Sequence, residues 1–143
     1  MITVDETEHL PLGEAGLTLF PPFAGGTSNE SGLFILCTVG DFDVLITGDA
    51  DAFTEKMLVK YRDIPDIELL IVGHHGSKNS SCEEFLRSAA PELAVISAGA
   101  NNAYGHPAPE TLERLEALGS EIHRTDEEGS VTVRVRDGQV GIS

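Results

Sequence analysis

Basic residues are scarce in this chain of 143 residues. Nine lysines and arginines stand against 24 aspartates and glutamates, which gives a formal net charge of −15. A surface with this charge repels phosphate backbones at long range, so a stand-alone nucleic-acid-binding module is disfavoured. A catalytic site can still process a phosphodiester where metal ions supply the local positive charge.

Cysteines and long apolar runs are also few. The two cysteines, Cys37 and Cys82, have no metal-type spacing and do not suggest a disulfide framework. No apolar run approaches the roughly 18 residues of a membrane-spanning helix, so we expect no transmembrane segment in this chain. The length suits one domain with its own core.

Short apolar runs, partly β-branched, predict the strands of a sheet. They cover residues 17–20, 33–39, 42–47, 67–72 and 93–97. Gly40-Asp41 separates two of these runs and predicts a hairpin turn. Residues 1–16 have no clear pattern and are interpreted as an edge segment. Residues 121–124 and 130–136 alternate as antiparallel strands do.

Helical spacing of apolar residues predicts three helices between these strands. The first covers residues 51–61, the second runs from about residue 82 to Pro91, and the third ends at Gly119. Ser81 and Glu84 have the spacing of a capping box at the start of the second helix. Strands and helices in this order predict an α/β layer with a mixed sheet.

Gly73-His74-His75-Gly76-Ser77 directly follows the strand expected at residues 67–72. Ligands collect at the carboxyl ends of strands in open α/β sheets, and glycines allow a tight turn there. Adjacent side chains of an extended segment point to opposite sides, so one of the two histidines is expected to face a site directly. The alternative is a turn with two solvated histidines.

Two further polar loops follow buried strands. Gly48-Asp49 ends the strand at residues 42–47, and Tyr104-Gly105-His106-Pro107 lies in the loop after residues 93–97. If these loops share one edge of the sheet, a carboxylate and two or three imidazoles converge. Such oxygen and nitrogen ligands suit zinc, manganese or iron.

Other polar residues of these loops are candidates for different roles. A Ser-His-Asp hydrolase would use Ser77, His75 and Asp49, but the chain has no Gly-x-Ser-x-Gly nucleophile elbow. Four residues could also make polar contacts to a substrate, although each one taken singly is more typical of a turn. They are Asn29, Ser31, Asn101 and Asn102.

Several short motifs occur in a specific order along the chain. They are Ser28-Asn29-Glu30-x-Gly32-Leu33, Leu45-Ile46-Thr47-Gly48-Asp49-Ala50, Gly73-His74-His75-Gly76-Ser77, Ile96-Ser97-x-Gly99, Asn102-x-Tyr104-Gly105-His106-Pro107, Arg124-Thr125 and Gly129. From about residue 17 to residue 135, this order resembles the metallo-β-lactamase-fold domain of the bacterial DNA-uptake channel family, ComEC-type, and its soluble relatives.

The resemblance implies a four-layer αββα sandwich with a two-metal hydrolase site that holds zinc or manganese. Asp49 then corresponds to the bridging carboxylate, and a metal-binding histidine corresponds to His74 or His75. The separation of 25 residues from Asp49 favours His74. Ser77, Asn29, Asn102 and His106 become candidate substrate contacts, with His106 also a possible ligand. The implied reaction is attack of metal-activated water on a phosphodiester, as in a DNA strand degraded during uptake.

The chain departs from the family at its principal metal motif, His-x-His-x-Asp-His. Its five histidines, His9, His74, His75, His106 and His123, do not form that motif. We therefore expect residues 1–143 to correspond to the C-terminal half of the domain, with a mixed sheet and helices on one face. The partial ligand set is expected to leave the isolated chain without substantial hydrolase activity.

Several expectations about partners follow from this half-domain interpretation. One sheet face would lack its packing partner, so we expect the isolated chain to form a symmetric homodimer. In the intact family protein, the resemblance implies a soluble domain attached to an inner-membrane channel. Two alternatives remain open: a small-substrate phosphodiesterase such as a phosphorylcholine esterase, which the lack of a basic patch favours, and a non-catalytic half-domain that acts in assembly.

Overall fold

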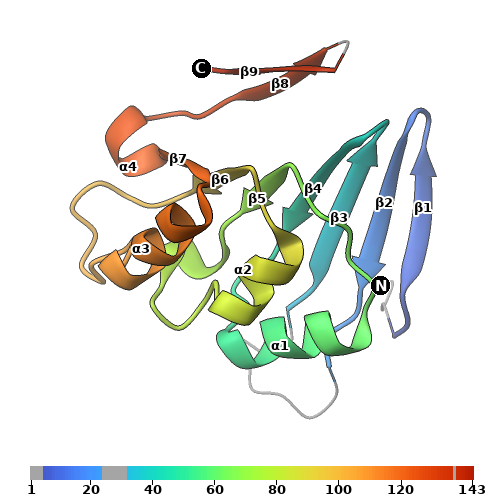
Figure 1. The fold of residues 1–143 in the computed structure, drawn as a ribbon, viewed down its shortest axis with the longest axis horizontal. Helices are drawn as coiled ribbons and strands as arrows, with labels where there is room; N and C mark the ends of the chain where they lie inside the picture. Colours follow the sequence, from blue (N-terminus) through green and yellow to red (C-terminus); the bar gives the residue numbers. More distant parts are fainter. Residues whose placement is uncertain (1–4, 24–31, 137) are drawn as a thin grey trace.

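The computed structural model describes residues 5–23, 32–136 and 138–143. Seven strands form one mixed sheet in chain order (Figure 1). They are β1 (Glu8–Leu12), β2 (Ala15–Phe20), β3 (Phe34–Val39), β4 (Phe42–Ile46), β5 (Leu69–Ile71), β6 (Leu93–Ile96) and β7 (Glu121–Arg124). Neighbours from β1 to β4 pair antiparallel, and neighbours from β4 to β7 pair in parallel. The β3–β4 hairpin turns at Gly40-Asp41, as predicted.

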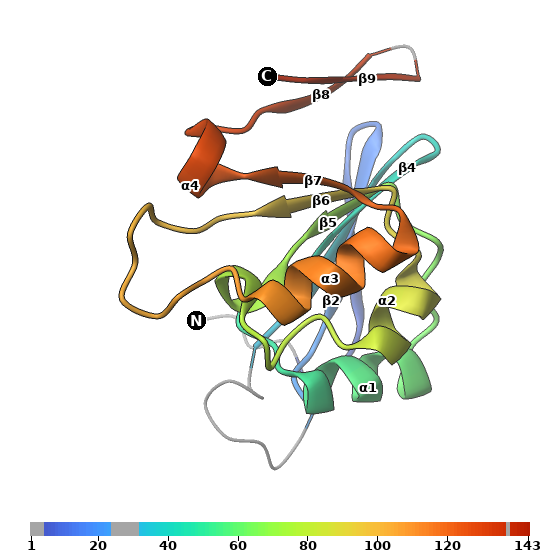
Figure 2. The same ribbon diagram turned by 60° about the vertical axis from the view of Figure 1, so that its left-hand side comes forward.

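Three helices cover one face of this sheet, as Figures 1 and 2 show. They are α1 (Ala52–Tyr61), α2 (Glu83–Ala89) and α3 (Pro109–Leu118). Side chains alternate along each strand, so every second residue faces the helices. Leu36, Leu45 and Leu70 do so and form the main core with Leu58 of α1 and Phe85 of α2. The α/β class and the helices on one face are therefore as predicted.

The opposite face of the parallel strands is also buried. Phe42, Leu69, Leu93 and Val95 form a second cluster, against which Val131, Val133 and Ile142 pack. The latter residues come from the C-terminal segment that contains the hairpin of β8 (Val133–Arg136) and β9 (Gln139–Ile142). Burial on both faces explains why β5 and β6 are almost continuously apolar.

The same face is less covered toward β1. Leu10 pairs with Leu17, and Val39 pairs with Ala15, so these side chains lie on the face away from the helices. Leu10, Leu12 and Val39 are 41%, 56% and 47% exposed. We call this side of β1, β2 and β3, which carries Leu10, Leu12, Leu17 and Val39, the open apolar face.

One expectation about strands needs correction. Residues 121–124 and 130–136 are not antiparallel partners: β7 joins the main sheet parallel to β6, and β8 pairs with β9. A short helix, α4 (Thr125–Glu128), separates β7 from β8 and redirects the chain (Figure 2). Residues 8–12, interpreted as part of an edge segment, form β1, the edge strand of the sheet. Among the described residues, no helix is long and apolar enough to cross a membrane.

Candidate functional site

Three loops meet at the edge where β4, β5 and β6 end. Parallel neighbours end on the same side, so this meeting follows from the sheet topology. Backbone hydrogen bonds connect the loops: the His74 N–H donates to the Gly48 carbonyl at 2.8 Å, and the Ala108 N–H donates to the Gly76 carbonyl at 2.8 Å. The loops carrying Asp49, the histidine pair and His106 are thus parts of one structure.

The histidine pair lies in a 3-10 turn, η2 (Gly73–Gly76), and not on an extended segment as expected. His74 has φ 49° and His75 has φ 55°, so both occupy the left-handed region. That region costs a residue with a Cβ about 1–2 kcal/mol. Consecutive strained residues of this kind persist where the surroundings hold them, and they concentrate at functional sites.

The His75 ring is oriented by a backbone carbonyl. Its Nδ1 lies 2.7 Å from the Ser97 carbonyl oxygen at the end of β6. A carbonyl only accepts, so Nδ1 carries the proton and Nε2 keeps a lone pair for a ligand. This arrangement is common for metal-binding histidines. A catalytic triad would instead place a carboxylate at Nδ1.

His74 and His106 lie side by side in an edge-on arrangement. Their ring centroids are 5.9 Å apart and the ring planes meet at 70°. The Nδ1 atom of each ring is buried and has no hydrogen-bond partner among the described residues. Burial, followed by the charges of His74 and His75, lowers the pKa of His106. A neutral imidazole with an unpaired nitrogen is suited to binding a metal ion.

Asp49 occupies the turn after β4, and its side chain is exposed. The preceding residue, Gly48, accepts the His74 N–H, so the carboxylate and the histidine pair belong to adjacent turns. Within the described ranges, no group of three or more metal-binding side chains is close enough to hold an ion. The unpaired imidazoles fit part of a metal site, but the described residues do not complete one.

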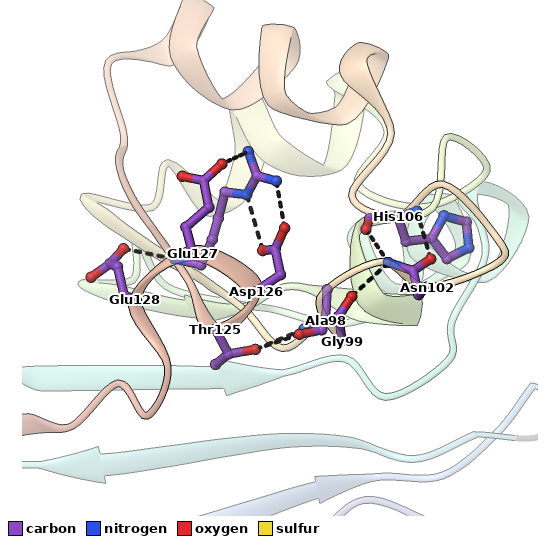
Figure 3. Close-up of polar contacts among 9 residues, drawn as sticks. Ala98, Gly99, Asn102, His106, Thr125, Asp126, Glu127 and Glu128 are labelled. Carbon is purple, nitrogen blue, oxygen red and sulfur yellow. Dashed lines mark hydrogen bonds and ion pairs between the residues drawn. The ribbon is translucent and has the colours of Figure 1, made fainter.

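The candidate substrate residues have different surroundings. Asn29 lies outside the described residues. Ser77 is buried, and its hydroxyl accepts the Asn79 N–H at 3.3 Å. The Asn102 amide donates to the carbonyls of Gly99 and His106, and its oxygen accepts the His106 N–H (Figure 3). The same oxygen also accepts the Tyr104 N–H. All four hydrogen-bonding positions of Asn102 therefore stabilise its own loop.

Thr125 holds the start of the loop that follows β6, and the sequence analysis gave this residue no role. The Thr125 hydroxyl accepts the Ala98 N–H and donates to the Ala98 carbonyl, both at 2.9 Å (Figure 3). The neighbouring Arg124 pairs with Asp126 at 2.7 Å and with Glu127 at 2.8 Å. Its hydrogen bond to Asp126 lowers the pKa of that carboxyl. Arg124 is thus neutralised locally and is a poor partner for a substrate phosphate.

Glu55 stabilises the segment that follows η2, and the sequence analysis did not identify this residue. Its side chain is fully buried between α1 and α2. The carboxylate accepts the Ser81 N–H at 2.6 Å and the Cys82 N–H at 2.8 Å. The expected capping box is wrong, because α2 begins at Glu83 and the residue before it, Cys82, makes no side-chain cap. Glu55 of another helix satisfies these N–H groups instead.

The segment capped by Glu55 directly follows η2. The Ser80 hydroxyl lies 3.0 Å from the Gly73 carbonyl and 2.9 Å from the Ser77 carbonyl. Arg114 of α3 donates to the Ser80 carbonyl at 2.9 Å. Residues 73–82 thus form one segment, with His74 and His75 near its start and the Glu55 hydrogen bonds at its end.

Solved structures share this fold. CmlA, a diiron β-hydroxylase from Streptomyces venezuelae, superposes with a TM-score of 0.61 over 86% of this chain and 33% of its own, at 16% sequence identity. A mutant of the CmlA β-hydroxylase gives the same TM-score. The likeness establishes the fold and supports the expected metallo-β-lactamase architecture.

Curated relatives are similar in sequence over most of this chain. ComE operon protein 3 of Bacillus subtilis is 34% identical over 111 residues, which are 78% of this chain and 14% of the relative. Competence protein ComA of Neisseria gonorrhoeae is 37% identical over 78% of the chain and 16% of its own length. Recombination protein 2 of Haemophilus influenzae is 38% identical over 73% and 13%.

No protein-family model matches the chain. The pairwise similarities each cover about three quarters of the chain, and the chain spans about one seventh of the length of these curated relatives. By this similarity the chain belongs to the ComEC-type competence protein family.

Proposed function

We propose that the chain supplies one side of a metal-dependent phosphodiesterase site in a competence protein that acts in DNA uptake. The observation that carries this proposal is that the loops of Asp49, of His74-His75 and of His106 meet at one sheet edge. There the imidazoles of His74 and His106 each keep a buried nitrogen with no partner among the described residues. Names of the relatives, which concern competence and recombination, support a DNA-related role.

Each residue has a definite task in this proposal. Asp49, His74 and His75 would hold the metal, and a bound zinc or manganese would lower the pKa of a water molecule and neutralise charge on the phosphodiester. The Ser97 carbonyl keeps the His75 ring oriented, with its Nε2 lone pair available. His106 contributes a neutral imidazole beside His74. The remaining ligands would come from a segment outside residues 1–143.

We expect the isolated chain to bind about one equivalent of zinc or manganese, since the imidazoles are already held in place. Elemental analysis and titration calorimetry would measure this binding. Asp49→Ala and His74→Ala are expected to weaken it at least about ten-fold, because each removes a direct ligand. His9→Ala is the matched control, because His9 lies on β1 and hydrogen bonds to Thr18. Binding that is equal in all variants would contradict the proposed ligands.

Hydrolysis is a separate expectation. With an incomplete ligand set, the isolated chain should turn over a phosphodiester no faster than its Asp49→Ala variant. Metal-dependent turnover above that control would overturn the half-site interpretation. A protein that contains this chain together with the missing half of the site should hydrolyse the same substrate and lose that activity in Asp49→Ala.

The open apolar face supports the proposal that a second unit packs on this sheet. Where the other half of the sandwich is present, we assign the open apolar face to its packing surface. The isolated chain would instead cover it with a second copy and form a symmetric dimer.

Light scattering at micromolar concentration tests the dimer. Leu12→Glu places a charge on the open apolar face and should shift the chain to a monomer. Leu118→Glu is the matched control, because Leu118 is similarly exposed at the end of α3 on the other side of the sheet. A monomeric parent chain, or equal behaviour of the two variants, would contradict the dimer.

A further inference from the structure

A small pocket lies beside the candidate metal ligands. It encloses about 200 Å³ and is lined by His75, Ala98, Gly99, Asn102, Tyr104 and His106. Pockets for drug-sized ligands usually have about 300–1,000 Å³, so this one suits one nucleotide base or a similarly small group. His75 and His106 belong both to the lining of this pocket and to the proposed phosphodiester site, so the two are directly adjacent.

Tyr104 is an exposed aromatic residue on the wall of this pocket. Its side chain is 84% exposed and stacks on His106, with centroids 6.0 Å apart and ring planes 21° from parallel. The Tyr104 N–H donates to Asn102, which in turn holds the His106 backbone. The loop thus presents one face of the tyrosine ring to solvent and fixes it at the site.

We propose that Tyr104 is a stacking platform for a nucleotide base whose phosphate lies beside the proposed metal site. This inference rests on the proposed phosphodiesterase function and adds a specificity-determining residue to it. A base stacked on Tyr104 would position the attached phosphodiester toward the imidazoles. The pocket holds one base, and the ring accepts any base because each has a planar π-face.

The charge of the chain favours this mode of binding over backbone contacts. A net charge of −15 gives phosphates no long-range attraction. Arg124, whose neighbour Thr125 holds the start of the Tyr104 loop, is already paired with Asp126 and Glu127. Stacking on an aromatic ring does not depend on positive charge, so Tyr104 offers the affinity that the surface electrostatics do not.

The lining also favours a base over a quaternary ammonium group. A choline-type cation is bound by cation–π contacts and by negative charge. The six lining residues, all within the described part of the chain, include one tyrosine and no carboxylate. The lining therefore lacks the negative charge that such a cation needs, whereas the ring of Tyr104 suits a flat base.

The test is a titration of the 143-residue chain with deoxyadenosine monophosphate, followed by the NMR signals of its two tyrosines, Tyr61 and Tyr104. We expect the Tyr104 ring signals to shift and those of Tyr61 to stay. Deoxyribose phosphate, which lacks the base, should leave both unchanged. Tyr104→Ala should weaken nucleotide binding roughly 5- to 150-fold, the range of one lost stacking contact, while Tyr104→Phe should retain it.

Three results would overturn the inference: unchanged nucleotide binding in Tyr104→Ala, equal shifts with deoxyribose phosphate, or Tyr104 shifts caused by phosphocholine but not by the nucleotide. Tyr61→Ala is the matched control, since Tyr61 is an exposed tyrosine on α1. Metal titration separates this inference from the function on which it rests. If the nucleotide binds in a Tyr104-dependent way and no metal binds, the metal site is rejected and the stacking platform stands. If metal binds and the nucleotide does not, the stacking platform is rejected and the metal site stands.

Discussion

Replacing Glu55 with alanine is expected to lower the free energy of unfolding by about 3 kcal/mol at about pH 4.5, where the Glu55 contribution is full. The substitution removes the acceptor of the Ser81 and Cys82 N–H groups and leaves a cavity between α1 and α2. An unsatisfied buried polar group costs about 1–3 kcal/mol, and the lost packing adds to this. Denaturant unfolding followed by circular dichroism measures the change. Glu113→Ala on α3 is a matched control, because the same truncation there removes an exposed side chain and should change stability little.

Glu55 also predicts a pH dependence of stability. Burial raises its pKa to about 7, against the opposing effects of the Cys82 and Ser81 N–H groups and the charge of Arg114. A raised pKa means that the folded state holds the proton more tightly than the unfolded state. The contribution of Glu55 to stability is therefore full below about pH 4.5 and is lost as the pH rises to about 7.

The size of this effect follows from the shift of the pKa. At 1.36 kcal/mol per unit, the Glu55 contribution falls by about 3 kcal/mol between pH 4.5 and pH 7. Glu55→Gln keeps the shape of the side chain and cannot ionise, so the difference in unfolding free energy between parent and variant should change by that amount. Unfolding curves measured at several pH values check this, and a pH-independent difference would show that folding does not shift the pKa of Glu55.

Gly76→Ala is expected to destabilise the chain by about 3 kcal/mol and to weaken metal binding. Gly76 has φ +78°, and an added Cβ would lie 2.6 Å from Cβ of Pro107 and 3.2 Å from Cγ2 of Ile96. Left-handed strain costs about 1–2 kcal/mol, and overpacking costs about 1–3 kcal/mol. Relief of the contact would move η2 away from the loop of His106, and the histidines would separate. Thermal unfolding and the metal titration measure the two effects.

A second glycine separates the two causes of this loss. Gly119 has φ +83° at the end of α3, and a Cβ added there would have no atom of the described residues within 4 Å. Gly119→Ala therefore carries the backbone strain without the steric contact and should cost about 1 kcal/mol. It should leave metal binding unchanged. Equal losses in the two variants would mean that the contact with Pro107 is relieved without displacing η2.

Local patterns in the sequence were sufficient for much of the fold and for the composition of the site. The β3–β4 hairpin follows from two apolar runs around Gly40-Asp41, and the predicted helices lie on one face of the sheet. Asp49, His74 and His106 follow three strands that prove to be neighbours, so their common edge was predictable. These features depend on residues close together in the chain, where periodicity and turn residues carry the information.

Other features depended on partners that are distant in sequence. Residues 121–124 alternate as an antiparallel strand would, yet β7 pairs in parallel with β6 because α3 returns the chain to the same sheet. Ser81 and Glu84 have capping-box spacing, yet the buried Glu55 takes that role from 26 residues away. Asn102 has the character of a substrate contact, but its amide is used fully within its own loop. That prediction, like the ligand roles of Asp49 and the histidines, stays to be tested.

The sequence by itself determined the alternation of strands and helices from β3 to β7, the family and the candidate metal ligands at the site. Only the tertiary structure decided the left-handed turn of His74 and His75, the Ser97 carbonyl that frees Nε2 of His75, and the pocket beneath Tyr104. The physical reason is that residue type sets what a side chain can donate, accept or bury. Which of these possibilities is used depends on the atoms that long-range packing brings within hydrogen-bond distance.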